Sequence, residues 1–460
     1  MSFEQIQERE RGLHRKLTSQ QMSMIAIGGA IGTGLFLGSK FAIGFAGPSV
    51  ILSYDIGGLI GLLLMGCLAE MVVAHTTSGS FGAYAEWYIS PLAGFLVRYA
   101  YWSCIVLAIG TEVTAVGEYM AFWFPAVPPW VWMAAFSAAL IGVNAMSVNM
   151  FGSVEYVFSS IKIFSIIGFV VAGAYVIWGQ HNPQFGPQNL VAGAGFFPNG
   201  LWGMWVAVVV SIFSYLSIEM IAVAAGEAEN PEQAVKRAFK ATIFRLVLFY
   251  LGSLSIILMI VPWNRISTGG SPFVTVMEVL KIPYAAGILN FVVVVAALSA
   301  MNSQIYITTR MMFSLSRAGD APKILGRLNA RGVPIFSLSL STLGVAVATI
   351  LALLFPQQAF LLMVSISMFG AMFTWMMIFI THLFFRRARR LAGNAALPFR
   401  LWFFPFSTLL GLSLIVAVLI TTWFTPDFHL TLVFGVPYIA FMVGLFALIR
   451  RARRGGEPGV

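Results

Sequence analysis

The sequence predicts an all-α membrane protein with twelve membrane-spanning helices. Hydrophobic residues make up 59% of the 460 residues, whereas charged residues make up only 10%. Apolar segments long enough to cross a bilayer recur along the chain. Two of them, the first and the sixth, are interrupted near their centres by glycines or serines. We therefore expect a bundle of spanning helices in which two helices are broken.

The apolar segments divide the chain into two halves and a remainder. They lie at residues 17–44, 49–74, 91–123, 130–147, 156–178, 199–225, 241–262, 284–314, 335–355, 360–385, 402–424 and 430–449. Spans one to five (17–178) and six to ten (199–385) form halves with an odd number of spans, so the second half is inverted relative to the first. Spans eleven and twelve (402–449) follow, and residues 1–16 and 450–460 are short tails.

The positive charge of the chain indicates which side of the membrane is cytoplasmic. Of the 27 Lys and Arg residues, 22 fall in alternate loops or tails on one side, and only Lys40, Arg265 and Lys281 fall on the other. Because cytoplasmic loops carry an excess of Lys and Arg, both termini are expected in the cytoplasm. The net charge of +10 is therefore a topology signal. Membrane lipid is an expected partner, and nucleic acid is not.

The first segment carries the sequence GGAIGTGLFLG at residues 28–38. Four of its first seven residues are glycine, which costs roughly 1 kcal/mol against alanine in a helix, so the helix should unwind halfway across the membrane. Unwound backbone at that depth must be buried in protein or line a cavity. Its free peptide groups suit a ligand with both a carboxylate and an ammonium. The alternative is that the small residues only allow close helix packing.

The sixth segment contains the sequence SIFSYLSIE at residues 211–219. Three serines and an acid interrupt an apolar run, although serines in a helix can also bond back to the preceding turn. Interrupted segments at matching positions in two halves are the best sequence indication of a transporter's binding site. This correspondence favours a second broken helix.

Three charged residues within the spans are candidates for proton coupling. Lys162 lies in the fifth span, two turns from its nearest acid, Glu155. An ammonium in hydrocarbon costs at least ~2.5–3.5 kcal/mol, so Lys162 should face the protein interior, where burial favours release of its proton. Alternatively, Lys162 stays charged and has only a structural role. Glu219, just past the second interruption, and Glu112, in the third span, are the other candidates.

The segment at residues 226–240, GEAENPEQAVKRAFK, has an amphipathic pattern. Asn230 suits a helix N-cap and Pro231 the first helical position. We expect a helix at the membrane surface here.

No arrangement of residues in the sequence predicts an enzyme, a cofactor or a metal site. Ser159 and Lys162 fit S-x-x-K, but the companion motifs are absent and the pair lies in a membrane segment. Cys67 and Cys104 both lie in apolar segments and are expected to serve as packing residues.

Four stretches resemble bacterial amino-acid permeases of the amino acid–polyamine–organocation superfamily. They are LHRKLTSQQMSMIAIGGAIGTGLFLGS (13–39), AGPSVILSY (46–54), GEAENPEQ (226–233) and RAGDAPK (317–323). The similarity extends over about residues 13–450. It implies a leucine-transporter-type fold in the bacterial plasma membrane, with twelve helices, a five-plus-five inverted repeat, and broken helices 1 and 6.

The resemblance also implies a binding site at the two interruptions. The substrate carboxylate would meet backbone N–H groups around Gly32, Thr33 and Gly34, as an anion does at a helix N-terminus. Its amino group would meet backbone carbonyls. The implied substrate-binding residues are Ala30, Gly32, Thr33, Gly34, Phe213, Ser214, Leu216 and Ser217, with Phe213 as an aromatic lid. The implied proton-coupling residues are Lys162 and Glu219, with Lys162 in the place of a coupling sodium ion, and Glu112 remains the third candidate from its position in the third span.

The chain departs from the family pattern at Leu216 and Ser217, because relatives commonly have glycine at one of these positions. The added side chains should crowd the substrate's side-chain pocket. The function expected is secondary active, proton-coupled uptake of a neutral L-amino acid by alternating access. The alternatives are an amino-acid exchanger and a membrane receptor that senses amino acids without transporting them.

Overall fold

The computed structural model describes most of the chain. The described residues are 3–9, 17–28, 31–180, 182–228, 230–267, 270–355, 359–393, 397 and 399–455. Ala30 and parts of both tails, which carry predictions made above, lie outside them. Within this described part the fold is helical, and its single β-contact is an isolated bridge between Leu17 and Ala228.

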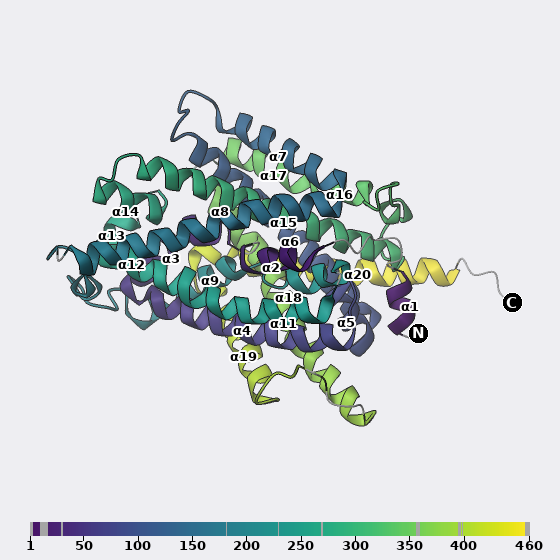
Figure 1. The fold of residues 1–460 in the computed structure, drawn as a ribbon. Helices are drawn as coiled ribbons and strands as arrows, with labels where there is room; N and C mark the ends of the chain where they lie inside the picture. Colours follow the sequence, from purple (N-terminus) through teal and green to yellow (C-terminus); the bar gives the residue numbers. More distant parts are fainter. Residues whose placement is uncertain are drawn as a thin grey trace.

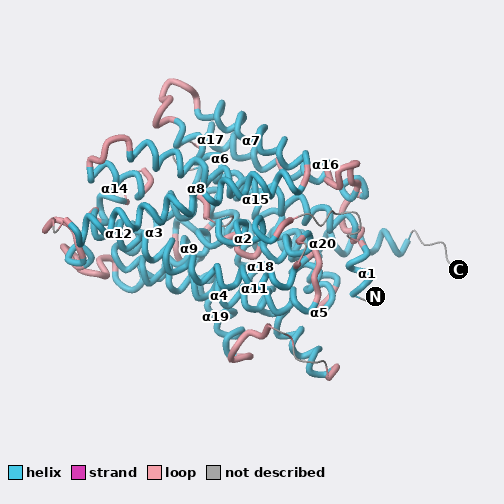
Figure 2. Tube along the Cα trace, in the orientation of Figure 1, coloured by secondary structure: helices cyan, strands magenta, loops and turns pink. Residues whose placement is uncertain are grey.

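The long helices run side by side, and most of the loops gather at the two ends of the bundle (Figures 1 and 2). The α-helices are α1 (Phe3–Glu8), α2 (Ser19–Gly28), α3 (Ser39–Ala46), α4 (Val50–Ala74), α5 (Ser80–Tyr88), α6 (Pro91–Met120), α7 (Pro129–Met146), α8 (Val148–Ala174), α9 (Gly200–Tyr215), α10 (Met220–Ala224), α11 (Pro231–Arg245), α12 (Ser253–Ile260), α13 (Trp263–Ile266), α14 (Pro272–Leu280), α15 (Ala285–Arg317), α16 (Ile335–Ser341), α17 (Leu343–Leu354), α18 (Ala359–Leu391), α19 (Phe406–Trp423) and α20 (Leu430–Gly455). Helix α1 and the C-terminal end of α20 lie at the same end of the bundle (Figure 1).

Nine helices of the described part are long and apolar enough to cross a membrane. They include α6, α15 and α18, and α6 packs closely against both of the others. Two shorter apolar helices, at Leu248–Ile260 and Ile335–Leu351, add to these. The multi-pass character predicted from the composition is therefore present.

The first apolar segment is interrupted in the structure. Helix α2 ends at Gly28, and Ile31 and Gly32 are not helical. The chain resumes as a π-helical segment, Gly34–Gly38, which continues into α3.

The sixth segment is interrupted in the same way. Helix α9 ends at Tyr215 and α10 begins at Met220. Leu216 takes an extended conformation, with ψ of 148°, and Ser217 has a φ of +75°. A left-handed backbone is uncommon for a residue other than glycine, which explains why the helix stops here.

Helix α11 lies within the segment whose amphipathic pattern predicts a helix at the membrane surface. Asn230 Oδ1 does accept the N–H of Gln233, at 3.4 Å, as an N-cap should. However, the helix continues without interruption from Pro231 to Ile260 through α12. Its buried side chains, Val235 and Phe239, belong to a helix that packs on α2 and α4. The apolar pattern of α11 therefore serves packing between helices.

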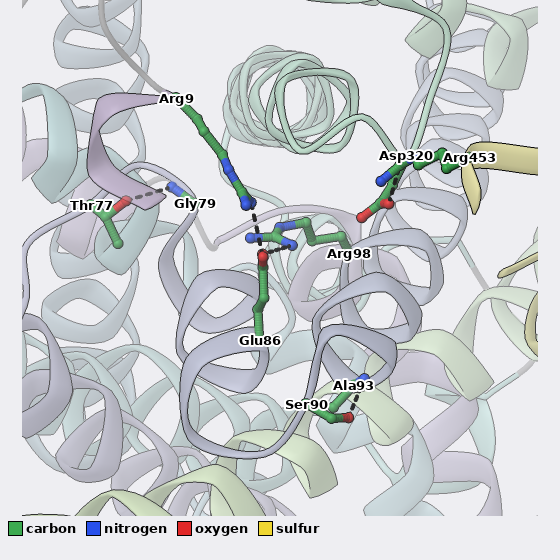
Figure 3. A network of polar contacts seen from close by, with 9 residues as sticks. All are labelled: Arg9, Thr77, Gly79, Glu86, Ser90, Ala93, Arg98, Asp320 and Arg453. Atoms are coloured by element: carbon green, nitrogen blue, oxygen red, sulfur yellow. Dashed lines mark hydrogen bonds and ion pairs between the residues drawn. The ribbon is translucent and has the colours of Figure 1, made fainter. Parts of the chain in front are cut away.

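An ion triad ties the N-terminal segment to helices α5 and α6 (Figure 3). Arg9 and Arg98 each place a guanidinium nitrogen 2.8 Å from the carboxylate of Glu86. Burial by itself raises the pKa of Glu86, but the two guanidinium groups outweigh it and lower the pKa below its usual value. A carboxyl whose pKa is lower in the folded state stabilises the protein above about pH 4.3, and this stabilisation is lost as the pH falls through the lowered pKa.

We expect Glu86→Gln to lower the melting temperature at pH 7, because it leaves the buried Arg98 without its counter-charge. The difference in melting temperature from the wild type should narrow as the pH falls below the usual pKa of a glutamate, about 4.3, and through the lowered pKa of Glu86. Melting curves from pH 3 to pH 7 check this, with the exposed Glu118→Gln as the control. A difference that stays constant over this range would contradict the ionic role of Glu86.

A second ion pair lies deeper in the protein, between the segment that follows α10 and helix α15. Arg310 Nε donates to Glu227 Oε1 at 2.9 Å, and Tyr306 donates its hydroxyl proton to the same oxygen at 2.7 Å. Both charged side chains are at most 3% exposed. The backbone carbonyl of Glu227 also accepts the N–H of Leu17, at 3.2 Å, so this residue joins the starts of α2 and α11 to α15.

We expect Glu227→Ala to destabilise the protein by about 3–5 kcal/mol, because it leaves the Arg310 charge buried and unpaired. The double variant Glu227→Ala/Arg310→Met should recover most of this loss. As a matched control, Glu232→Ala breaks an exposed pair with Lys236 and should cost less than about 1 kcal/mol. Denaturation in detergent compares the four proteins, and equal losses in Glu227→Ala and Glu232→Ala would refute the assignment.

Candidate functional site

The two interrupted helices meet in the middle of the bundle. The Ser214 hydroxyl, on the last turn of α9, donates to the carbonyl of Gly34 at 2.7 Å. A Cβ atom added at Gly34 would lie 2.6 Å from the Cα of Ser214, closer than real Cβ contacts allow. Glycine is therefore required at position 34 for the two backbones to approach this closely.

A small cavity of about 10 Å³ lies between the two interruptions. Its lining residues are Gly32, Gly34, Glu112, Phe213, Ser214, Leu216, Ser217, Ala300 and Gln304. The structure thus brings together six of the eight predicted substrate-binding residues, and Thr33 is fully buried beside them. About 10–15 Å³ is the least space that holds one water, so the walls must separate to admit an amino acid.

Two charged side chains each bind one backbone group of the first interruption. Glu112 Oε2 accepts the N–H of Thr33, at 3.2 Å. Lys162 Nζ donates to the carbonyl of Ile31, at 3.0 Å. Both side chains are buried, at 3% and 0% exposed. Helix α6 supplies the anion and helix α8 the cation, so the unwound backbone is held between opposite charges.

Lys162 is also part of a buried polar network. Its ammonium donates to the Ser299 hydroxyl at 2.6 Å, and that hydroxyl donates to Glu155 Oε1. Glu155 Oε1 lies 4.0 Å from Lys162 Nζ, and Glu155 also accepts hydrogen bonds from Ser159 and Asn302. Ser299 therefore bridges the lysine and the carboxylate.

Glu219 does not contribute to the lining of the cavity. Its Oε1 accepts the hydroxyl proton of Tyr101 at 2.6 Å and the N–H of Ser217 at 3.1 Å. Its Oε2 accepts the indole N–H of Trp375 at 3.1 Å. Glu219 therefore holds the second interruption against α6 and α18.

Several residues around the site were missed by the sequence analysis. Three tyrosines support the end of α9: Tyr54 contacts the Ser214 hydroxyl at 2.9 Å, Tyr250 donates to the Ser214 carbonyl at 2.7 Å, and Tyr215 donates to the Tyr54 carbonyl at 3.0 Å. Helix α15 adds Ala300 and Gln304 to the cavity wall. Nothing in the local sequence around these residues marks them, because their partners lie far away along the chain.

Comparison with known proteins identifies the family of the chain. The family model described as "Amino acid permease" matches residues 21–453. The chain belongs to the amino acid permease family. Permeases are transporters and not enzymes. Membership of this family and nine long apolar helices in the described part of the chain identify a multi-pass protein of the bacterial inner membrane.

The permease is similar to several bacterial proteins over nearly its whole length. It is 36% identical to the amino acid permease YtnA of Bacillus subtilis, over 96% of each chain. It is 38% identical to the aromatic amino acid transport protein AroP of Salmonella typhimurium LT2, over 94% of this chain and 96% of the relative. It is 36% identical to AroP of Escherichia coli K12, over 96% and 97%.

Proposed function

We propose that the permease is a proton-coupled transporter that takes up a neutral L-amino acid by alternating access around its two interrupted helices. The observation that carries the proposal is the contact between the unwound segments at Gly34 and Ser214. Discontinuous helices whose free peptide groups face one point at mid-depth form the substrate sites of many secondary transporters.

The architecture that we propose has twelve spans. The nine long helices and the two shorter apolar ones give this number if the helix at Gly34–Ala74 is divided at Gly47. Gly47 has a φ of +62°, and a Cβ atom there would lie 2.2 Å from the Pro198 side chain, so it marks a turn between α3 and α4. Residues 17–178 and 199–385 would be the two inverted repeats, residues 402–449 the last two helices, and residues 1–16 and 450–460 the tails.

The same proposal places both termini in the cytoplasm. The ends of α1 and α20 lie at one end of the bundle (Figure 1), which fits an even number of spans. Twenty-two of the 27 Lys and Arg residues belong to loops and tails assigned to that end, as cytoplasmic loops require.

The substrate carboxylate, in this proposal, takes over the N–H groups around Gly32, Thr33 and Gly34 when the cavity widens. Glu112 holds the Thr33 N–H in the closed state and must give it up. Two carboxylates that share one site cannot both remain ionised without a large cost. Substrate binding would therefore favour proton uptake by Glu112, which couples the proton to the substrate.

In this proposal Lys162 is the second residue, besides Glu112, that couples proton movement to transport. Its ammonium holds the Ile31 carbonyl, and Ser299 links it to Glu155, so a proton that leaves the lysine has a hydroxyl and a carboxylate within reach. Glu219 would act on the coupling through the conformation of the second interruption, since it binds the N–H of Ser217.

Aromatic amino acids are the first substrates to test within the neutral class, because two of the relatives are aromatic amino acid transport proteins. The cavity wall is consistent with a neutral side chain. Phe213, Leu216 and Ala300 are apolar, and Glu112 is the only ionisable residue that lines the cavity within the described part of the chain.

Uptake into proteoliposomes tests the proposal. We expect accumulation of radiolabelled phenylalanine or another neutral amino acid when the lumen is alkaline, and loss of accumulation when a protonophore is added. Transport that requires a preloaded amino acid and ignores the proton gradient would indicate an exchanger. Binding detected by a thermal shift without any uptake would indicate a sensing receptor.

We expect Ser217→Gly to widen the range of accepted substrates, because it removes a side chain from the cavity wall. It should also raise the melting temperature, since serine at a φ of +75° is strained and glycine is not. Competition of labelled substrate by the 20 common amino acids, together with a melting curve, checks both effects. Ser214→Gly is the contrasting variant, because it removes a hydroxyl that binds Gly34. An unchanged competition profile in Ser217→Gly would place the substrate's side chain elsewhere.

A further inference from the structure

A second pocket, of about 320 Å³, lies where the C-terminal end of α18 meets the segment that leads into α19. In Figure 1 this end of α18 leaves the bundle at the lower right. The volume falls within the roughly 300–1,000 Å³ of small-molecule sites. Four arginines line the pocket together with Glu70 and Phe404, and they are Arg386, Arg389, Arg390 and Arg400.

Glu70 neutralises only one of these arginines. Its carboxylate lies 2.6 Å from Arg386 Nε and 2.8 Å from Arg386 Nη2. It also accepts the N–H of Leu401 at 3.1 Å, and His382 Nε2 lies 3.2 Å away. The guanidinium of Arg386 lies over the Phe404 ring, at 4.9 Å from its centre. Glu70 and Arg386 therefore form a fixed, charge-balanced wall, and no ion pair joins Glu70 to Arg390 or Arg400.

The guanidinium groups of Arg390 and Arg400 give the pocket a positive charge. Arg390 and Arg400 are exposed, and neither has an acidic partner among the described residues. Arg389 lies on the same wall, 5.8 Å from the centre of the Phe385 ring. A guanidinium binds phosphate oxygens through two parallel hydrogen bonds. Several guanidinium groups around one pocket therefore favour a phosphate-bearing ligand.

Large apolar side chains within six positions of Arg390 or Arg400 in the sequence are exposed. Leu391 is 79% exposed, and Trp402, Phe403 and Phe406 are 47%, 79% and 77% exposed. Aromatic side chains concentrate at the interface between membrane and water, and basic pockets between helices on the cytoplasmic side hold anionic headgroups. A soluble phosphate would use the arginines alone, whereas a phospholipid would use both groups.

We propose that this pocket binds the headgroup phosphate of an anionic phospholipid, with the acyl chains against Leu391, Trp402, Phe403 and Phe406. A bound lipid would join the loop before α19 to α4 through the Arg386–Glu70 pair. This site is separate from the cavity between the interrupted helices and does not depend on the transport mechanism.

Lipid retention by the purified full-length permease tests the proposal. The probes are short-chain phosphatidylglycerol, short-chain phosphatidylcholine and inorganic phosphate, each measured by thermal shift and by native mass spectrometry. The test variant is R389Q/R390Q/R400Q. The matched control is K323Q/R327Q/R331Q, which removes three exposed positive charges from the loop between α15 and α16.

Phosphatidylglycerol should stabilise the wild type and the control, and the test variant should bind it at least ~10-fold more weakly, since each basic residue near an anionic lipid contributes roughly fivefold. If the triple variant does not fold, the single variants R390Q and R400Q should each show a smaller loss. Equal retention in the test variant and the wild type would overturn the proposal. An equal effect of inorganic phosphate or phosphatidylcholine would overturn the assignment to an anionic lipid.

Discussion

Replacing Gly34 by alanine is expected to reduce uptake by roughly 10–100-fold while the protein still folds. The new Cβ atom would meet the Cα of Ser214 at 2.6 Å, and neither atom belongs to a side chain that can turn away. Overpacking of this kind costs typically 1–3 kcal/mol, which is enough to shift a conformational equilibrium by roughly one to two powers of ten. The two interrupted helices could then no longer close on each other, so the transport cycle would stall in an open form.

Initial rates in proteoliposomes measure this effect, and circular dichroism with a melting curve confirms the fold. Gly168→Ala and Gly142→Ala are matched controls, because an added Cβ at either position meets no atom within 4 Å. Both controls should transport at the wild-type rate. Wild-type uptake by Gly34→Ala would show that the close approach of the two segments is not part of the cycle.

The sequence was sufficient to predict where the two helices break. At the first interruption, four glycines weaken the helix by their intrinsic propensity, which is a local property. At the second, the serines were ambiguous by themselves, and the matching position in the other half of the chain decided the prediction. The structure adds a reason that the sequence does not show, because Ser217 adopts a left-handed conformation that serine rarely takes.

The contacts that hold the interruptions could not be predicted, because they join residues that are far apart in the chain. Ser214 and Gly34 are 180 positions apart, and Glu112 and Thr33 are 79 apart. Helical periodicity places Glu112 and Glu118 on different sides of α6. It does not predict which of these two residues lies next to the first interruption. Tertiary packing decides this, and it buries Glu112 and leaves Glu118 exposed.

The amphipathic pattern of α11 shows a different limit. Its apolar side predicts a helix with one buried face, and that prediction is met. The pattern does not say whether the buried face meets lipid headgroups or other helices. Phe239 packs against Phe399, with ring centres 5.2 Å apart, so a protein neighbour covers it.

Lys162→Arg is expected to keep the permease folded and to abolish the stimulation of uptake by a proton gradient. Arginine keeps a positive charge near the Ile31 carbonyl and Glu155, but it cannot release a proton in a protein. If Lys162 has only a structural role, proton-stimulated uptake should survive this exchange. If Lys162 gives up a proton during transport, proton-stimulated uptake should be lost. Uptake with and without an inward proton gradient, from pH 5.5 to pH 8, distinguishes the two roles.

Removing the charge gives the complementary result. Lys162→Met should destabilise the protein by about 3–5 kcal/mol, because Glu155 then remains buried without a counter-charge. The double variant Lys162→Met/Glu155→Gln should restore much of the stability and still transport without proton dependence, as measured by counterflow. If a proton gradient still stimulated uptake by the double variant, Lys162 and Glu155 would not take part in the coupling. Glu112 would then be the coupling residue, because it binds the N–H group that the substrate takes over.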